Sequence, residues 1–151
     1  MSWRVRVAEP RDAERIGELV RTALGYDFPP NRIAKRLPVM LSRSTDRIYV
    51  AFREEDGLVG GYVHTADYET VYNDGMKNIL SLAVDEAFRE QGLGRLLLAE
   101  VERWAMACGC EAVRLVSGAN RTGAHAFYQH CGYHIRKEQK NFIKYFTSEN
   151  G

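Results

Sequence analysis

The stretch Leu80-Ser-Leu-Ala-Val-Asp-Glu-Ala-Phe-Arg-Glu-Gln-Gly-Leu-Gly-Arg95 is the most informative part of this sequence. An apolar run ends at Val84, and two glycines, Gly92 and Gly94, come directly before a long amphipathic pattern. This order predicts a buried strand, a tight loop and the first turn of a helix. The N–H groups of such a turn lack partners within the helix, and glycines let an anion approach them. The stretch therefore predicts either a phosphate-binding loop or a plain connection between strand and helix.

The composition is that of a globular protein without strong net charge. The chain has 151 residues, 45% of them hydrophobic, and 21 Lys and Arg against 20 Asp and Glu give a net charge of +1. This length predicts a single domain, residues 1–151. The balanced charge gives no general attraction to nucleic acid, and no window approaches the ~20 apolar residues of a membrane span. We therefore expect neither nucleic acid nor a membrane as a partner.

The N-terminus and the cysteines predict a cytoplasmic protein. Residues 1–7 lack the apolar core of a signal peptide. The three cysteines, Cys108, Cys110 and Cys131, are odd in number and lack C-x-x-C spacing. They also lack histidines at the spacing of a zinc finger. We therefore expect reduced thiols and no bound metal.

Apolar periodicity predicts the remaining elements. The expected ranges are a strand at 2–7, a helix from 10 that Gly25 ends, a helix at 31–41 that Pro38 should kink or interrupt, strands at 47–53 and 58–65, a polar connection at 67–77, a strand at 79–84, a helix from 93 to 108, a strand at 112–116, a helix at 122–130, and a final strand pair at 133–135 and 142–146. The order β-α-α-β-β-β-α-β-α-β-β predicts an α/β, or α+β, domain with a mixed sheet.

A second segment changes the interpretation of the glycine loop. Arg89-Glu-Gln-Gly92-Leu-Gly94 has neither the glycine spacing of a Rossmann dinucleotide fingerprint nor the Gly-Lys-Ser/Thr of a P-loop. About thirty residues later follows Ala124-His-Ala-Phe127-Tyr128-Gln-His-Cys-Gly132-Tyr133. Together the two segments resemble the GNAT superfamily of acetyl-CoA-dependent N-acetyltransferases. The resemblance covers essentially the whole chain.

The resemblance implies the GNAT fold, a central mixed and mostly antiparallel sheet flanked by helices, with acetyl-CoA as co-substrate and no metal. The strand end would pair with the pantetheine arm and the glycine loop would bind the pyrophosphate, which assigns Leu82, Ala83, Val84, Arg89, Glu90, Gln91, Gly92, Leu93, Gly94 and Arg95 to the cofactor. Phe127 and Tyr128 would also contact it, with the Tyr128 hydroxyl near the thioester sulfur. A phenol (pKa ~10) is a weaker acid than a thiol (~8.5), so stabilisation of the departing thiolate is an alternative to proton donation.

The segment before Tyr128 departs from the family pattern. Many members carry an Asn seven residues before this tyrosine, where this chain has Arg121, with Asn120 one place earlier. Either residue could contact the cofactor. The pattern with Arg121 and His125 resembles a branch that acetylates small-molecule amines such as aminoalkylphosphonates. His125 itself is a candidate for a relay or for a structural role.

The acceptor side has no comparable motif. The amine must lose a proton before it attacks the thioester, and the candidate bases are His64, Asp67, Glu69 and, through a water molecule, Ser81. By the resemblance, Tyr26 and Phe28 would form part of the acceptor wall. We expect direct transfer to a small-molecule primary amine, in a ternary complex. The alternatives are a protein N-terminal or lysine acetyltransferase and a non-catalytic acyl-CoA-binding regulator. Dimerisation is common on this fold, so a homodimer is an alternative to a monomer.

Overall fold

A computed structural model of the chain describes residues 2–147. The chain divides into two units, residues 1–116 and 117–151. The described part of the first unit holds a β-sheet and three α-helices, and that of the second holds one α-helix and an irregular segment.

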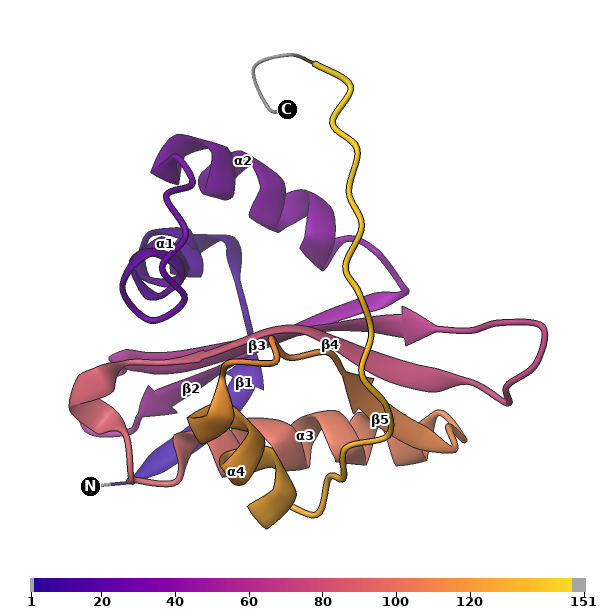
Figure 1. Ribbon diagram of the computed structural model, residues 1–151. Coiled ribbons are helices and arrows are strands. Elements are labelled where there is room, and N and C mark those ends of the chain that lie inside the picture. Colours follow the sequence, from indigo (N-terminus) through magenta and orange to yellow (C-terminus); the bar gives the residue numbers. More distant parts are fainter. Residues whose placement is uncertain (1, 148–151) are drawn as a thin grey trace. The chain divides into compact units, whose positions relative to one another are not determined.

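The first unit is a five-stranded sheet with helices on both faces (Figure 1). Its elements are β1 (Trp3–Val7), the 3₁₀ turn η1 (Pro10–Asp12), α1 (Ala13–Thr22), α2 (Pro30–Leu41), β2 (Asp46–Arg53), β3 (Val59–Tyr68), β4 (Met76–Val84), the 3₁₀ turn η2 (Glu86–Phe88), α3 (Leu93–Ala107) and β5 (Ala112–Leu115). The strands lie in the order β1-β2-β3-β4-β5, and only β4 and β5 are parallel. The mixed, mostly antiparallel sheet predicted from the sequence is therefore confirmed.

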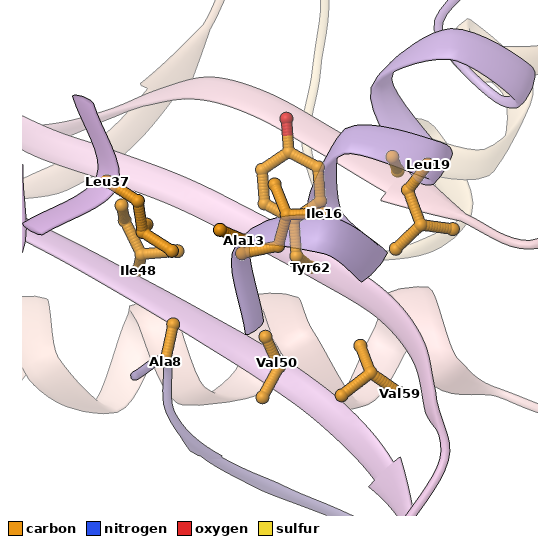
Figure 2. Packing of buried hydrophobic residues seen from close by; sticks show 10 residues of the cluster. Ala8, Ala13, Ile16, Leu19, Leu37, Ile48, Val50, Val59 and Tyr62 are labelled. Carbon is orange, nitrogen blue, oxygen red and sulfur yellow. The ribbon is translucent and has the colours of Figure 1, made fainter. Parts of the chain in front are cut away.

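The two faces of the sheet are covered by different helices. α1 and α2 lie over one face and α3 over the other (Figure 1). Figure 2 shows Ile16 of α1 beside the ring of Tyr62 and Leu37 of α2 beside Ile48. Under α3, the side chains of Leu97 and Val101 are fully buried. Burial of each such side chain contributes about 1.5–3 kcal/mol, so truncation of one to Ala would leave a destabilising cavity.

The central hairpin is longer than predicted. The prediction that residues 67–77 form a polar connection is wrong at both ends, because β3 continues to Tyr68 and β4 begins at Met76. The buried Lys77 explains the error: its Nζ lies 2.6 Å from Asp67 Oδ1 and 3.9 Å from the centre of the Trp104 ring. An ion pair and an aromatic ring let charged residues occupy a strand, and periodicity alone does not show such partners.

Pro38 does not interrupt α2, which continues to Leu41. A proline removes one intrahelical hydrogen bond, and here only three residues follow it in the helix. Leu37, directly before it, is buried in the core beside Ile48, and this packing holds the last turn in place.

The described part of the second unit contains α4 (Thr122–His130). The predicted strand pair at 133–135 and 142–146 is wrong, since residues 133–146 form no strand. Phe142 and Phe146 are 90% and 94% exposed, so the apolar side chains of this segment do not pack on a core. An isolated two-stranded hairpin has marginal stability in water. A strand-like sequence pattern therefore does not form a hairpin when its apolar side chains have no core to pack on.

Candidate active site

The end of β4 has one unpaired edge. β3 pairs with β4 as far as Val84, whereas β5 pairs with it only from Met76 to Ile79. Within the first unit, therefore, no strand lies beside residues 80–84 on the β5 side. Unpaired backbone N–H and C=O groups at a strand edge can bind an extended ligand as an added strand would. This "β4 edge", residues 80–84, includes the predicted cofactor residues Leu82, Ala83 and Val84.

The loop after β4 contains two left-handed residues and leads directly into a helix N-terminus. Glu90 and Gly92 both adopt left-handed conformations, with φ of 71° and 84°, and α3 begins at Leu93. The first N–H groups of α3 have no acceptor within the helix. Successive N–H groups in this kind of turn, together with a helix N-terminus, form an anion-binding concavity. The residues from Arg89 to Arg95, here called the glycine loop, thus combine a left-handed turn with a helix N-terminus, an arrangement suited to an anion.

Aromatic side chains brace the glycine loop from β1. The Trp3 indole N–H donates a hydrogen bond of 2.9 Å to Gln91 Oε1, and its ring lies 4.9 Å from that of Phe88. The Arg53 guanidinium lies 5.4 Å from the Phe88 ring centre. A pre-ordered loop loses less conformational entropy when a phosphate binds. The alternation of residues 2–7 predicts the strand that carries Trp3, but not this contact, which spans 88 residues.

A glycine in β3 permits this close packing. A Cβ added at Gly60 would lie 2.8 Å from Leu93 Cδ2 and 2.8 Å from two atoms of the Trp3 ring. Any larger residue would push the first turn of α3 or Trp3 away from the sheet. Gly60 therefore helps to set the position of the glycine loop.

An ionic contact fixes the turn between β4 and the glycine loop. Asp85 Oδ1 accepts a hydrogen bond from the Ala87 N–H, and Asp85 Oδ2 lies 2.6 Å from Arg15 Nη2 of α1. The hydrogen bond from Arg15 is the main cause that lowers the pKa of Asp85. The Arg15 Nε also donates to the Val59 carbonyl at 2.6 Å. Arg15 thus links α1, β3 and the end of β4.

A pocket of about 470 Å³ lies on the α1 and α2 side of the sheet. Its lining is mostly apolar and aromatic, with one carboxylate, one guanidinium and one imidazole. It consists of Ile16, Val20, Tyr26, Asp27, Phe28, Ile33, Arg36, Leu37, Met40, Ile48, Tyr62 and His64. This volume is in the usual range for small-molecule sites. The predicted wall residues Tyr26 and Phe28 both line this space, here called the α1–α2 pocket.

His64 in the α1–α2 pocket is hydrogen-bonded to a buried carboxylate. Its Nε2 lies 2.8 Å from Asp46 Oδ2 on the neighbouring strand. Burial raises the pKa of Asp46, but hydrogen bonds from His64 and Thr45 outweigh that effect and lower it. A carboxylate at Nε2 favours the tautomer that carries its proton there and leaves the Nδ1 lone pair free. His64 therefore has the arrangement of an oriented base.

Ser81 connects the α1–α2 pocket to the β4 edge. Its Oγ lies 2.9 Å from the Tyr62 hydroxyl, and Tyr62 lines the pocket. Burial raises the pKa of Tyr62, so its phenol stays protonated and a hydrogen-bond donor near neutral pH. Ser81 also pairs in register with His64 across the β3–β4 ladder. The structure thus brings His64, Ser81 and Tyr62 to one place.

The other two candidate bases lie elsewhere. Asp67 and Glu69 line a second pocket, of about 420 Å³, together with Lys77 and Trp104 of the α3 side. Asp67 is engaged there in its ion pair with Lys77. Neither residue lines the α1–α2 pocket.

The second unit carries the remaining predicted site residues. Asn120 and Arg121 are exposed and directly precede α4, whereas Phe127 and Tyr128 lie half-buried within it. Burial raises the pKa of Tyr128. His125 Nε2 lies 2.8 Å from the Gly118 carbonyl, a contact that suits a structural histidine.

The described residues contain neither a candidate metal-binding cluster nor a candidate membrane-spanning helix. Across residues 2–147, His, Cys, Asp and Glu side chains form no group of three or more that could hold a metal ion. None of the described helices combines the length and the apolar character needed to cross a membrane.

Sequence comparison places most of the chain in one family. Residues 13–133 match the Acetyltransferase (GNAT) family. The GCN5-related N-acetyltransferase 4, chloroplastic, from Arabidopsis thaliana is 25% identical over 142 residues, which cover 79% of this chain and 48% of that protein. The chain thus spans about half the length of this relative.

Solved structures share the fold at low identity. A transcriptional regulator from Bacillus halodurans C-125 has a TM-score of 0.84 at 18% identity, covering 95% of this chain and 100% of its own. An aminoglycoside 6'-N-acetyltransferase from Acinetobacter haemolyticus has a TM-score of 0.81 at 15% identity, covering 97% of this chain and 100% of its own. A glucosamine-6-phosphate N-acetyltransferase from Arabidopsis thaliana has a TM-score of 0.75 at 20% identity, covering 97% of this chain and 100% of its own. These likenesses show the fold.

Proposed function

Because the chain belongs to the GNAT family of acetyltransferases, we propose that it transfers the acetyl group of acetyl-CoA to a primary amine held in the α1–α2 pocket. One observation carries this proposal: Ser81 belongs to the β4 edge, and its Oγ is 2.9 Å from the hydroxyl of Tyr62, which lines the pocket. A thioester held along the β4 edge and an amine in the pocket would meet at this strand.

The β4 edge and the glycine loop fit acetyl-CoA as a co-substrate. The free strand edge offers amide partners to the pantetheine arm, and the α3 N-terminus offers N–H groups to the pyrophosphate. Charge-assisted hydrogen bonds contribute roughly 1.5–3 kcal/mol each, so a few would give micromolar affinity.

His64 is the proposed base. With Nε2–H donated to Asp46, the Nδ1 lone pair takes a proton from the bound ammonium. The neutral amine then attacks the thioester carbonyl carbon, the C–S bond breaks, and the sulfur leaves with the bonding electron pair. The attacking nitrogen loses its extra proton and the thiolate takes one up, so the products are an N-acetyl amide and free coenzyme A.

Tyr128 is proposed to stabilise the departing thiolate by a hydrogen bond. Because burial raises the pKa of this phenol above its ordinary value, full proton transfer to the thiolate is even less favourable than for a free tyrosine. We expect Tyr128→Phe to lower kcat about tenfold or more and to change the Kd for acetyl-CoA by less than about twofold. Steady-state kinetics and calorimetry give the two numbers, and a wild-type kcat would refute this role.

A small-molecule acceptor fits the α1–α2 pocket better than a protein segment. The pocket is a concave space of about 470 Å³ with an aromatic and apolar lining, in the size range of small-ligand sites. Two of the structural neighbours are named for small-molecule amines, an aminoglycoside and glucosamine-6-phosphate.

Two assays test the proposal. Calorimetric titration with acetyl-CoA measures binding of the co-substrate alone. Release of free thiol from acetyl-CoA, measured with polyamines, aminoglycosides, aminophosphonates, amino acids and lysine peptides, measures transfer. The proposal requires binding together with amine-dependent thiol release. Binding without release for any amine would favour a non-catalytic acyl-CoA-binding regulator, and release with peptides alone would favour a protein acetyltransferase.

A further inference from the structure

The wall that α2 contributes to the α1–α2 pocket contains one cation among apolar side chains. Ile33, Arg36, Leu37 and Met40 all line the pocket and share one face of the helix, at spacings of three and four residues. Among residues 2–147, the Arg36 guanidinium has no ion pair or hydrogen bond. An arginine on an apolar stripe with five free donors is suited to bind an anionic group that enters the pocket.

The charge around Arg36 is positive. α2 carries Arg32, Lys35 and Arg36 and no Asp or Glu. The Arg32 guanidinium lies 4.8 Å from the ring centre of Phe28, so a second cation lies against the pocket wall. Like charges gathered on one wall favour an anionic ligand and disfavour a cationic one.

Few carboxylates oppose these cations. Asp27 is the acidic side chain that lines the pocket, and it is exposed. Asp46, the other nearby carboxylate, is hydrogen-bonded to His64. The α1 residues of the lining, Ile16 and Val20, are apolar. Asp27 and Arg36 are both exposed, so a polycation would meet one carboxylate at the pocket against the three cations of α2.

From this arrangement we propose that the acceptor is a small amine that also carries a carboxylate or phosphate group, which Arg36 binds. The inference rests on the proposed function and specifies its substrate class. The guanidinium forms paired hydrogen bonds with either anion, and Phe28, Ile33 and Met40 cover the body of the acceptor. His64, on the strand across the pocket, receives the amine. Polycationic amines such as aminoglycosides and polyamines are poor acceptors.

Matched pairs of amines test this assignment. Thiol release is measured with L-phenylalanine against L-phenylalaninamide, γ-aminobutyrate against its amide, and phosphoethanolamine against ethanolamine, with kanamycin and spermidine as polycations. We expect the anionic member of at least one pair to have a kcat/KM about tenfold or more above its partner. The carboxylate and phosphate pairs show which anion is used.

Variants locate the preference. Arg36→Glu should remove this preference and Arg36→Lys should retain part of it. Lys35→Glu should weaken it clearly less than Arg36→Glu does, because Lys35 contributes to the positive charge of α2 but does not line the pocket. Equal or better turnover of the neutral partner in every pair would overturn the proposal. The proposal would also be overturned if Arg36→Glu kept the same preference for the anionic amine, or if Asp27→Asn and not Arg36→Glu changed that preference. If none of the amines caused thiol release, the result would instead contradict the proposed function and remove the basis of this inference.

Discussion

The glycine loop and the α1–α2 pocket bind their proposed ligands with different parts of the chain. The loop uses backbone: left-handed Glu90 and Gly92, the first N–H groups of α3, and the free edge of β4. The pocket uses side chains, with His64 on β3 and Arg36 on α2. A backbone site depends on local conformation, whereas a side-chain site depends on which elements the fold brings together. Changes in the two regions should therefore affect different measurable quantities.

The largest expected effect is on the side-chain site. His64→Ala removes the proposed base, and kcat should fall about 10²- to 10⁴-fold near neutral pH while the Kd for acetyl-CoA stays unchanged. Asp46→Asn should give a smaller loss, because His64 remains but its tautomer is no longer fixed. Steady-state kinetics with calorimetry separates the two quantities. His134→Ala, at an exposed histidine, is the control, and full activity in His64→Ala would exclude this base.

The next effect is on the backbone site. Gly92→Val forces a β-branched residue to φ near +84°, and the loop should relax away from this conformation. We expect the Kd for acetyl-CoA to rise about tenfold to a hundredfold in calorimetry, with the protein folded by circular dichroism. Gly109→Val is a matched control, since Gly109 follows the other end of α3 with φ of 73° and equally open space. Similar affinities for both variants would contradict the placement of the pyrophosphate.

A smaller effect concerns the frame of the pocket. Arg6 forms two hydrogen bonds, of 2.8 and 2.9 Å, with the buried Asp12, which directly precedes α1. Burial raises the pKa of Asp12, but the hydrogen bonds from Arg6 and the Glu9 N–H outweigh it and lower the pKa. The pair therefore contributes its full stability above the unfolded-state pKa, and the contribution is lost as pH falls through the lower folded-state pKa.

This linkage gives a stability measurement. Asp12→Asn should reduce the free energy of unfolding by about 2–3 kcal/mol at neutral pH, measured by urea denaturation. The wild type and the variant should begin to converge below about pH 4 and become equal only below the lower folded-state pKa of Asp12. Asp27→Asn, at an exposed carboxylate, should change stability little. A constant difference down to acid pH would show that Asp12 acts by packing and not by its charge.

The smallest effect concerns the brace of the glycine loop. Trp3→Phe removes the hydrogen bond to Gln91 and keeps a ring near Phe88. An exposed neutral hydrogen bond contributes about 0.5–1.5 kcal/mol, so the Kd for acetyl-CoA should rise about two- to tenfold. Trp104→Phe, on the opposite end of α3, is the control. Equal affinities in calorimetry would show that the loop orders without Trp3.

The backbone site was easier to predict from the sequence than the side-chain site. Gly92 marks a required left-handed backbone conformation, and the glycine loop was recognisable from residue types and spacing. The left-handed conformation of Glu90, with φ of 71°, could not be predicted, because nothing in a glutamate side chain indicates it. The β4 edge depends on where β5 stops pairing, a property of two strands and not of one.

The side chains of the pocket were harder to predict. His64 was one of four equal candidates. Its partner Asp46 emerges only from the register of β2 against β3, in which Ile48 lies opposite His64 and Asp46 opposite Ala66. Arg36 had a local signal, a cation at i+3 from Ile33 on an apolar stripe, but its meaning needs the sheet on the other side of the pocket. The strand boundaries near Lys77 were mispredicted because its charge is stabilised by an ion pair with Asp67 and by the Trp104 ring, contacts that the local sequence does not show.

The contact between Trp3 and Gln91 gives the protein an internal optical probe. The chain has two tryptophans, and Trp3 lies against the glycine loop whereas Trp104 lies under Arg47 and Lys77 at the second pocket. In a Trp104→Phe background, indole emission therefore comes from the loop brace alone. Ligand binding at the α3 N-terminus would be followed in real time without a label, and loop ordering could be timed separately from acetyl transfer.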